Sequence, residues 1–230
     1  MPRNRVPKTF DRAIAVVGVG CVLPDAFRVD AFWKNTLAGH RALRTLSGGP
    51  YAWERYHDPN GLDTERAASI VGARVDGWSF DWRRFRVPPK DVETVNPLAL
   101  MTVDAGAQAL DAVKVLPKER AGVFLGATGF GWQRDAALRI RMGEIEDALR
   151  GALEASGRSL AALETVRARL DARLGPVTDD TIVNGPSSVA GGRLSMIYDL
   201  RGLHYAVDAG FASALAALEV GVRSLRDGTL

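Results

Sequence analysis

The stretch VDAGFASALAALEVGVRSL, residues 207–225, decides the fold and poses the question of function. Its first residues read as the end of a strand, Ala209 and Gly210 as a tight turn, and the remainder as an apolar helix. Such a bend presents one side chain at a helix N-terminus, where unpaired backbone N–H groups favour negative charge. A cysteine at that point would be a good thiolate nucleophile. The side chain here is Phe211, which can neither attack, donate nor accept.

Ser213 is the nearest hydroxyl to the bend, and His204 begins the strand before it. A serine nucleophile needs a general base within hydrogen-bond reach. His204 lies at the far end of the strand, and no other base occurs nearby in the sequence. We therefore expect no catalytic pair between these two residues.

Strands and helices alternate along the rest of the chain. Runs of β-branched and small apolar residues predict three buried strands, at 13–20, 121–128 and 202–209. Helical patterns cover four further segments, at 29–39, 96–113, 187–200 and 212–226. This alternation predicts an α/β fold. We expect a flexible tail at residues 1–11 and one domain over residues 12–230.

A helical insert is predicted at about 134–174, with a break at Ser156 and Gly157. Each of its two helices carries one apolar stripe, with Arg and Glu on the opposite face. The members of the two stripes are Leu138, Met142, Ile145, Leu149 and Leu153, then Leu160, Leu163, Val166, Leu170 and Leu174. We expect both helices to lie on the body of the domain, and a lid or docking role is the alternative.

Composition narrows the function classes. The net charge is +3, from 30 basic and 27 acidic residues whose signs alternate along the chain, so we expect no nucleic-acid binding. The longest apolar run near the start, 13–23, is too short to span a bilayer and lacks a signal-peptide cleavage pattern. The single cysteine, Cys21, has no metal-ligand cluster around it, so no metal site is predicted and a cytoplasmic location is expected.

Several motifs together resemble the β-ketoacyl synthase family. VDAGFASAL resembles the VDTACSSSL nucleophile elbow of that family, with Phe211 at the position of the active-site cysteine. Five further segments resemble family motifs in the same order, at 15–39, 85–110, 122–128, 185–195 and 198–202. They include GPSSVAGGRLS, which resembles NSVAAGRIS, and GVFLGAT, which resembles GVFVG. The resemblance covers nearly the whole chain apart from the tail and the helical insert.

The resemblance implies a thiolase-like fold of two similar α/β halves, of which this chain matches the N-terminal half of a layered αβα fold. In the family, the cysteine holds an acyl chain as a thioester. Two histidines in the second half assist decarboxylation of a malonyl unit carried on acyl carrier protein. Here Phe211 replaces the cysteine, and the sequence ends at Leu230, before that second half. None of the histidines present, His40, His57 and His204, matches a family catalytic histidine, so no catalytic residue is assigned.

The same resemblance assigns places to the residues around Phe211. The elbow and acyl pocket would be formed by Ala209, Gly210, Phe211, Ala212 and Ser213. The strand that pairs across the family's two-fold dimer axis would be His204, Tyr205, Ala206, Val207 and Asp208. A ketosynthase-type homo- or heterodimer partner is therefore implied, with acyl carrier protein as a further partner. No cofactor is implied, and acyl groups on the carrier protein are the candidate ligands.

Cys21 and the glycines before it could be taken for a nucleophile and a nucleotide-binding loop, and the sequence favours neither. The family carries a small packed cysteine at this turn, so we interpret Cys21 as structural. Gly18 and Gly20 fit the first two glycines of a dinucleotide-binding loop, but the third position is Leu23 and Pro24 follows. We therefore expect no nucleotide site.

Three functions remain open. The altered elbow and the VPPK sequence at 87–90 resemble chain-length-factor-like ketosynthase domains. The first function is therefore that of a non-condensing structural partner, in which the Phe211 ring fills the space that a thioester would occupy. The second is an enzymatic contribution to condensation or decarboxylation, which Phe211 cannot support by hydrogen bonding. The third is a fragment or split half, which would leave an apolar face uncovered.

Overall fold

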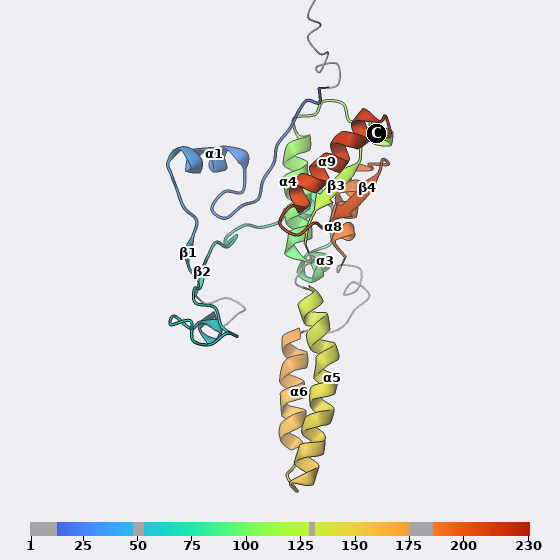
Figure 1. The fold of residues 1–230 in the computed structure, drawn as a ribbon. Coiled ribbons are helices and arrows are strands. Elements are labelled where there is room, and N and C mark those ends of the chain that lie inside the picture. Colours follow the sequence, from blue (N-terminus) through green and yellow to red (C-terminus); the bar gives the residue numbers. More distant parts are fainter. Residues whose placement is uncertain (1–12, 48–52, 129–131, 175–185) are drawn as a thin grey trace, which may run out of the picture. The chain divides into compact units, whose positions relative to one another are not determined.

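A computed structural model describes residues 13–47, 53–128, 132–174 and 186–230 (Figure 1). The expected tail at 1–11 lies outside these ranges. The chain divides into two compact units. The larger takes in Trp82–Val103 and Leu116–Leu230, and the smaller takes in Ala15–Asp81 and Asp104–Val115.

The larger unit is built on two parallel strands. β3 (Val123–Gly126) pairs with β4 (His204–Val207), residue for residue from Val123 opposite His204 to Gly126 opposite Val207. Helices α8 (Ser187–Tyr198) and α9 (Ser213–Arg226) both pack on this pair (Figure 1). The predicted strands at 121–128 and 202–209 and the predicted helices at 187–200 and 212–226 are confirmed.

The two helices cover opposite faces of the strand pair. A Cβ atom on Gly191 of α8 would lie 3.4 Å from Val123 Cγ1 and 3.7 Å from Leu125 Cβ. A Cβ atom on Gly221 of α9 would lie 3.4 Å from the Phe124 ring. Because successive side chains of a strand point to opposite faces, Phe124 and its two neighbours identify the two sides. The unit is therefore a helix–sheet–helix sandwich, and its small residues permit the close packing.

Short helices complete the larger unit. They are α2 (Trp82–Phe85), α3 (Pro89–Thr94) and the 3-10 turn η2 (Lys118–Arg120). Helix α4 (Pro97–Leu110) contributes residues to both units, and it buries Ala99, Leu100, Val103 and Ala107. Pro97 sits in its first turn, where a missing N–H costs nothing. The predicted helix at 96–113 is thus confirmed, with an earlier end.

The smaller unit contains α1 (Val29–Leu37), the 3-10 turn η1 (Trp53–Tyr56) and a short antiparallel pair, β1 (Arg44–Thr45) with β2 (Val71–Gly72). Gly39 follows α1 with φ +65°, so the predicted glycine stop lies in the left-handed conformation that glycine accommodates best. The predicted helix at 29–39 is confirmed.

The predicted buried strand at 13–20 is wrong. This segment forms no strand, and Val16, Val17 and Val19 are 82%, 66% and 62% exposed. Its alternate residues Gly18 and Gly20 instead touch the backbone of α4, at the Ala109 and Ala105 carbonyls. Among the described residues no neighbouring strand pairs with it, and a strand exists only through its ladder hydrogen bonds.

The region predicted as a helical insert contains two helices, α5 (Trp132–Ala155) and α6 (Ala161–Leu174), which run side by side (Figure 1). Gly157, at the predicted break, has φ +66°. Met142 and Leu163 are buried, and Arg167 of α6 forms an ion pair of 2.7 Å with Glu146 of α5. That these helices lie on the body of the domain stays a prediction.

Candidate functional site

The bend between β4 and α9 is held by two side chains. Gly210 has φ +57°, a left-handed conformation that strains any residue with a Cβ atom. Its backbone N–H donates to the Asp208 carboxylate at 3.1 Å. The Ser213 hydroxyl accepts from the Ala209 N–H at 3.0 Å and donates to the Gly210 carbonyl at 2.6 Å. The turn is thus fixed by its flanking residues, without the side chain of Phe211.

Phe211 occupies the tip of this bend, and its side chain is fully exposed, with a relative accessibility of 113%. None of the described residues covers the ring, and its placement in an acyl pocket stays a prediction. A plug role would require a surface beyond the described residues.

The start of α9 keeps its anion-favouring character. Its N-cap residue, Ala212, makes no side-chain cap hydrogen bond. The first-turn N–H groups of a helix without such a cap are left for water, an anion or a partner. The site therefore retains the electrostatics of a nucleophile elbow but has no nucleophile at its tip.

The structure separates Ser213 from His204. Ser213 is only 5% exposed, and its hydroxyl is used twice in the turn. The His204 Nε2 lies 3.2 Å from the backbone carbonyl of Ser188 in α8, to which it donates in the matching tautomer. The two side chains thus bond different partners in this structure.

Strand β4, predicted as the dimer strand, presents an open edge. It pairs on one side with β3, and the described sheet has these two strands only. His204, Tyr205 and Ala206 are exposed, and the Tyr205 ring lies 5.7 Å from the ring of Phe124. An edge strand with unpaired N–H and C=O groups can accept another strand. The geometry is thus compatible with pairing to a partner, which no contact in this chain tests.

Helix α9 is apolar on two sides. One side carries the buried Ser213 and Ala217 and packs on β3. The other side is exposed and continues the line of Phe211 at helical spacing, with Leu215 at 72%, Leu218 at 62% and Leu225 at 49% accessibility. Glu219, Arg223 and Arg226 form the polar part of this helix, so its apolar surface is wider than the side that packs on β3. We call the second set, Phe211, Leu215, Leu218 and Leu225, the outer stripe.

Cys21 has the environment of a packed residue. Its backbone N–H donates to the Gln108 side-chain oxygen at 3.3 Å, and the Gln108 amide donates to the Cys21 carbonyl at 3.1 Å. Burial, with a smaller contribution from Asp30, raises the pKa of the Cys21 thiol, so its thiolate is disfavoured. Gly18 and Gly20 face helix carbonyls, which would repel a phosphate. Both structural interpretations therefore agree with the contacts.

The described histidines and acidic residues were compared with the needs of a metal site. Among the described residues, no group of three or more His, Cys, Asp or Glu side chains could hold an ion. His40 instead lies 3.0 Å from Asp25, which also binds Arg44 at 2.7 Å. None of the helices that the structure describes has the length and apolarity needed to cross a membrane.

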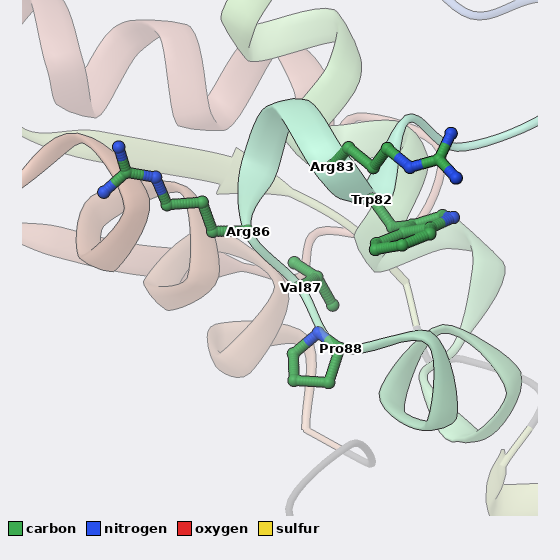
Figure 2. A pocket seen from close by; sticks show the side chains of 5 residues that line it. All are labelled: Trp82, Arg83, Arg86, Val87 and Pro88. Atoms are coloured by element: carbon green, nitrogen blue, oxygen red, sulfur yellow. The ribbon is translucent and has the colours of Figure 1, made fainter.

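Sequence reasoning missed one feature, a shallow pocket of about 360 Å³ formed by the segment around α2 (Figure 2). It is lined by Trp82, Arg83, Arg86, Val87 and Pro88. The only signal in the sequence was a cluster of aromatic and basic residues before two prolines. Such a cluster does not reveal how the backbone turns, and the backbone path creates the hollow.

Comparisons with known sequences agree with this geometry. Residues 11–230 match the family described as "Beta-ketoacyl synthase, N-terminal domain". The chain is 27% identical over 234 residues to a phenolphthiocerol/phthiocerol polyketide synthase of Mycobacterium tuberculosis, in a match that covers 97% of this chain and 13% of that protein. It is 28% identical over 128 residues to a non-reducing polyketide synthase of Penicillium herquei, in a match that covers 52% of this chain and 6% of that protein.

Solved structures show the same fold. The oxazolomycin ketosynthase domain OzmH KS7 of Streptomyces albus JA3453 matches with a TM-score of 0.68 and 23% identity, over 93% of this chain and 32% of that one. The ketosynthase from module 6 of the bacillaene synthase of Bacillus subtilis 168 matches with a TM-score of 0.62 and 17% identity, over 94% and 30%. The predicted α/β fold, the N-terminal half of a thiolase-like αβα architecture, is confirmed. The chain therefore belongs to the β-ketoacyl synthase family, and the part of that family which it matches is the N-terminal domain.

Proposed function

We propose that this chain is a non-condensing member of its family, a chain-length-factor-like structural partner of an active ketosynthase in polyketide or fatty acid biosynthesis. One observation carries the proposal. The elbow is built and held by Asp208 and Ser213, yet the residue at its tip is Phe211. An aromatic hydrocarbon ring cannot form a thioester. The chain therefore keeps the turn that would present a nucleophile but has no side chain there that could hold an acyl group. The relatives found by sequence are polyketide synthases, which favours the polyketide setting.

The partner surface would combine the β4 edge and the outer stripe. A strand of the active ketosynthase would extend the sheet at His204–Val207, on the side that β3 leaves open. The Phe211 ring would then enter the partner's acyl tunnel or its rim. A buried phenyl ring adds apolar contact area and removes tunnel volume. In this role the chain would set the length of an acyl product without making it.

Carrier-bound acyl groups would be the ligands that Phe211 meets, and no cofactor is needed for this role. Acyl carrier protein would reach the complex through the active partner. We also propose a cytoplasmic location, since the one cysteine has no second cysteine in this sequence with which to form a disulfide.

The direct test is acyl loading. The purified chain is incubated with acyl- and malonyl-carrier protein and its intact mass is measured, with an active ketosynthase as positive control. The proposal expects no covalent acyl adduct on this chain. Stoichiometric acylation of any of its residues would overturn the non-condensing role.

A second test measures the partner role. The active ketosynthase is assayed with wild-type chain or with Phe211→Ala, and product chain lengths are read by mass spectrometry. A smaller side chain should lengthen the products, since it returns volume to the tunnel. Identical product profiles in the presence of a formed complex would contradict the plug role.

The alternative proposal is that the chain is a fragment or split half of a β-ketoacyl-carrier-protein synthase, contributing to condensation only with other chains. The outer stripe of α9 and the exposed valines at 16, 17 and 19 favour it, since both surfaces have the composition of a covered core. The chain also spans about a third of the ketosynthase chains that share its fold. A monodisperse monomer with cooperative unfolding would count against this alternative.

A further inference from the structure

The pocket around α2 combines an apolar floor with two cations. The indole of Trp82 and the side chains of Val87 and Pro88 form the floor (Figure 2). The side chains of Arg83 and Arg86 extend from its two sides and point away from each other (Figure 2). Both arginines are exposed, whereas Trp82 and Val87 are half-buried. A ligand lying on the floor would thus meet a positive charge at each end.

Neither arginine is neutralised within the part of the chain that the structure describes. No described carboxylate lies within ion-pair distance of Arg83 or Arg86, whereas Arg167 binds two and Arg201 binds two. The guanidinium carbon of Arg83 instead lies 4.7 Å from the centre of the Trp82 ring, a cation–π contact that leaves its N–H donors available. The donors of both arginines therefore remain open to an anionic partner.

Arg86 is also held in an unusual backbone conformation. Its φ is +54°, in the left-handed region that disfavours residues with a Cβ atom. Glycine would fit this position without strain. This φ ends α2, since the Val87 N–H donates to the Trp82 carbonyl at 3.0 Å and the Arg86 N–H to the Arg83 carbonyl at 3.3 Å, as in a Schellman C-cap. The end of the helix thereby places Arg86 beside the hollow.

We propose that this pocket binds a short acidic segment of another protein chain. An apolar side chain of the segment lies on the Trp82, Val87 and Pro88 floor, and flanking carboxylates bind Arg83 and Arg86. A peptide fits better than a single phosphate, because the two guanidinium groups diverge and one small anion cannot bridge them (Figure 2). The inference goes beyond the proposed function, since it involves neither Phe211 nor the β4 edge.

The test uses a fluorescein-labelled peptide, acetyl-Glu-Asp-Leu-Glu-Asp-amide, with binding to the chain followed by fluorescence anisotropy. The key variant is Arg86→Gly, which removes the guanidinium and suits a left-handed φ, so it should fold at least as well as the wild type. Arg86→Lys tests charge alone. Arg226→Gln, an exposed arginine in α9, is the matched control for net charge.

The wild type should bind the acidic peptide, and Arg86→Gly should weaken binding by about fivefold, while Arg226→Gln leaves it unchanged. Arg86→Lys should fall between them, since lysine keeps the charge but loses the planar donor fork. A peptide with Gln and Asn in place of Glu and Asp should not bind. Equal binding by wild type and Arg86→Gly, no binding by the wild type, or displacement of the peptide by equimolar inorganic phosphate would each overturn the proposal.

Discussion

Gly126, at the end of β3, lies against the backbone of Ser213, at the start of α9. A Cβ atom at residue 126 would overlap the Ser213 carbonyl group and lie 2.7 Å from the Cα atom of Ala214. Ser213 also forms the two hydrogen bonds that hold the bend before α9. The contact with Gly126 therefore sets how closely this bend approaches strand β3. The bend can take this position because residue 126 of the neighbouring strand is a glycine, which has no side chain to collide with it.

Gly126→Ala should destabilise the chain by about 1–3 kcal/mol, because the start of α9 must move away from β3. Unfolding by urea, followed by circular dichroism, measures the change. Gly143→Ala is the control, since nothing lies within 4 Å of a Cβ atom there and α5 is helical around it. That variant should gain about 0.5–1 kcal/mol. A neutral Gly126→Ala would show that the helix start is not held by this contact.

Phe211→Cys should restore a reactive thiol. Residue 211 is exposed and precedes a helix whose N-cap offers no side-chain hydrogen bond, so the thiolate is favoured. Burial raises the pKa of the Cys21 thiol, so Cys21 should react slowly at neutral pH and faster as the pH rises. Iodoacetamide labelling followed by peptide mass spectrometry should show residue 211 reacting about tenfold faster than Cys21. Equal rates would mean that the helix start does not act on this position.

Arg86→Gly should stabilise the chain by about 1 kcal/mol, because it removes the strain of a left-handed φ at a residue with a Cβ atom. Thermal and urea unfolding measure the gain. Arg84→Gly, two residues earlier in α2, is the comparison and should destabilise, since glycine is a poor helix former. A loss of stability in Arg86→Gly would show that the arginine side chain holds the local fold.

Leu215→Glu with Leu218→Glu should reduce self-association. Both side chains lie on the outer stripe and are mostly exposed, so in a lone chain they form a contact surface for another copy or for aggregation. Sedimentation velocity over a concentration series should show association for the wild type and less for the double variant. Ile140→Glu, which replaces an apolar residue 70% exposed on α5, is the control. A wild type that stays monomeric throughout would argue that the outer stripe needs no cover.

Asp25→Asn should flatten the acid dependence of stability. Hydrogen bonds from His40 and Arg44 lower the pKa of the Asp25 carboxyl, so this group stabilises the folded chain above its unfolded pKa. That contribution is lost as the pH falls through the folded pKa. Asparagine tolerates the left-handed φ of +58° at this position. As the pH falls from neutral into the acid range, the urea midpoint should drop less in Asp25→Asn than in the wild type or in the exposed control Asp147→Asn.

The sequence predicted those elements whose periodicity is local. Strands β3 and β4, helices α4, α8 and α9 and the two helices of the insert each carry their own apolar pattern, and all form close to the expected bounds. The residues at 13–20 carry an equally strong strand pattern, yet they form none. A strand depends on a neighbour elsewhere in the chain or in another chain, and its own residues do not contain that information.

The turn at Ala209 and Gly210 follows from small residues before a helix, and it is observed. The two hydrogen bonds of the Ser213 hydroxyl were not predicted, because they depend on the exact path of the turn. The full exposure of Phe211 depends on what stands opposite the bend, which no local pattern reports. The left-handed backbone conformation of Arg86 was not predicted either, since no sequence rule places an arginine at a positive φ.

The bond network beneath the bend also bears on how such chains arise. Asp208 and Ser213 shape the turn through backbone groups, so the side chain at position 211 takes no part in the hydrogen bonds that hold it. Phenylalanine and cysteine codons differ by a single base. After gene duplication, a copy of a working synthase could thus lose its reactive group, or regain it, while its scaffold stayed under unchanged selection.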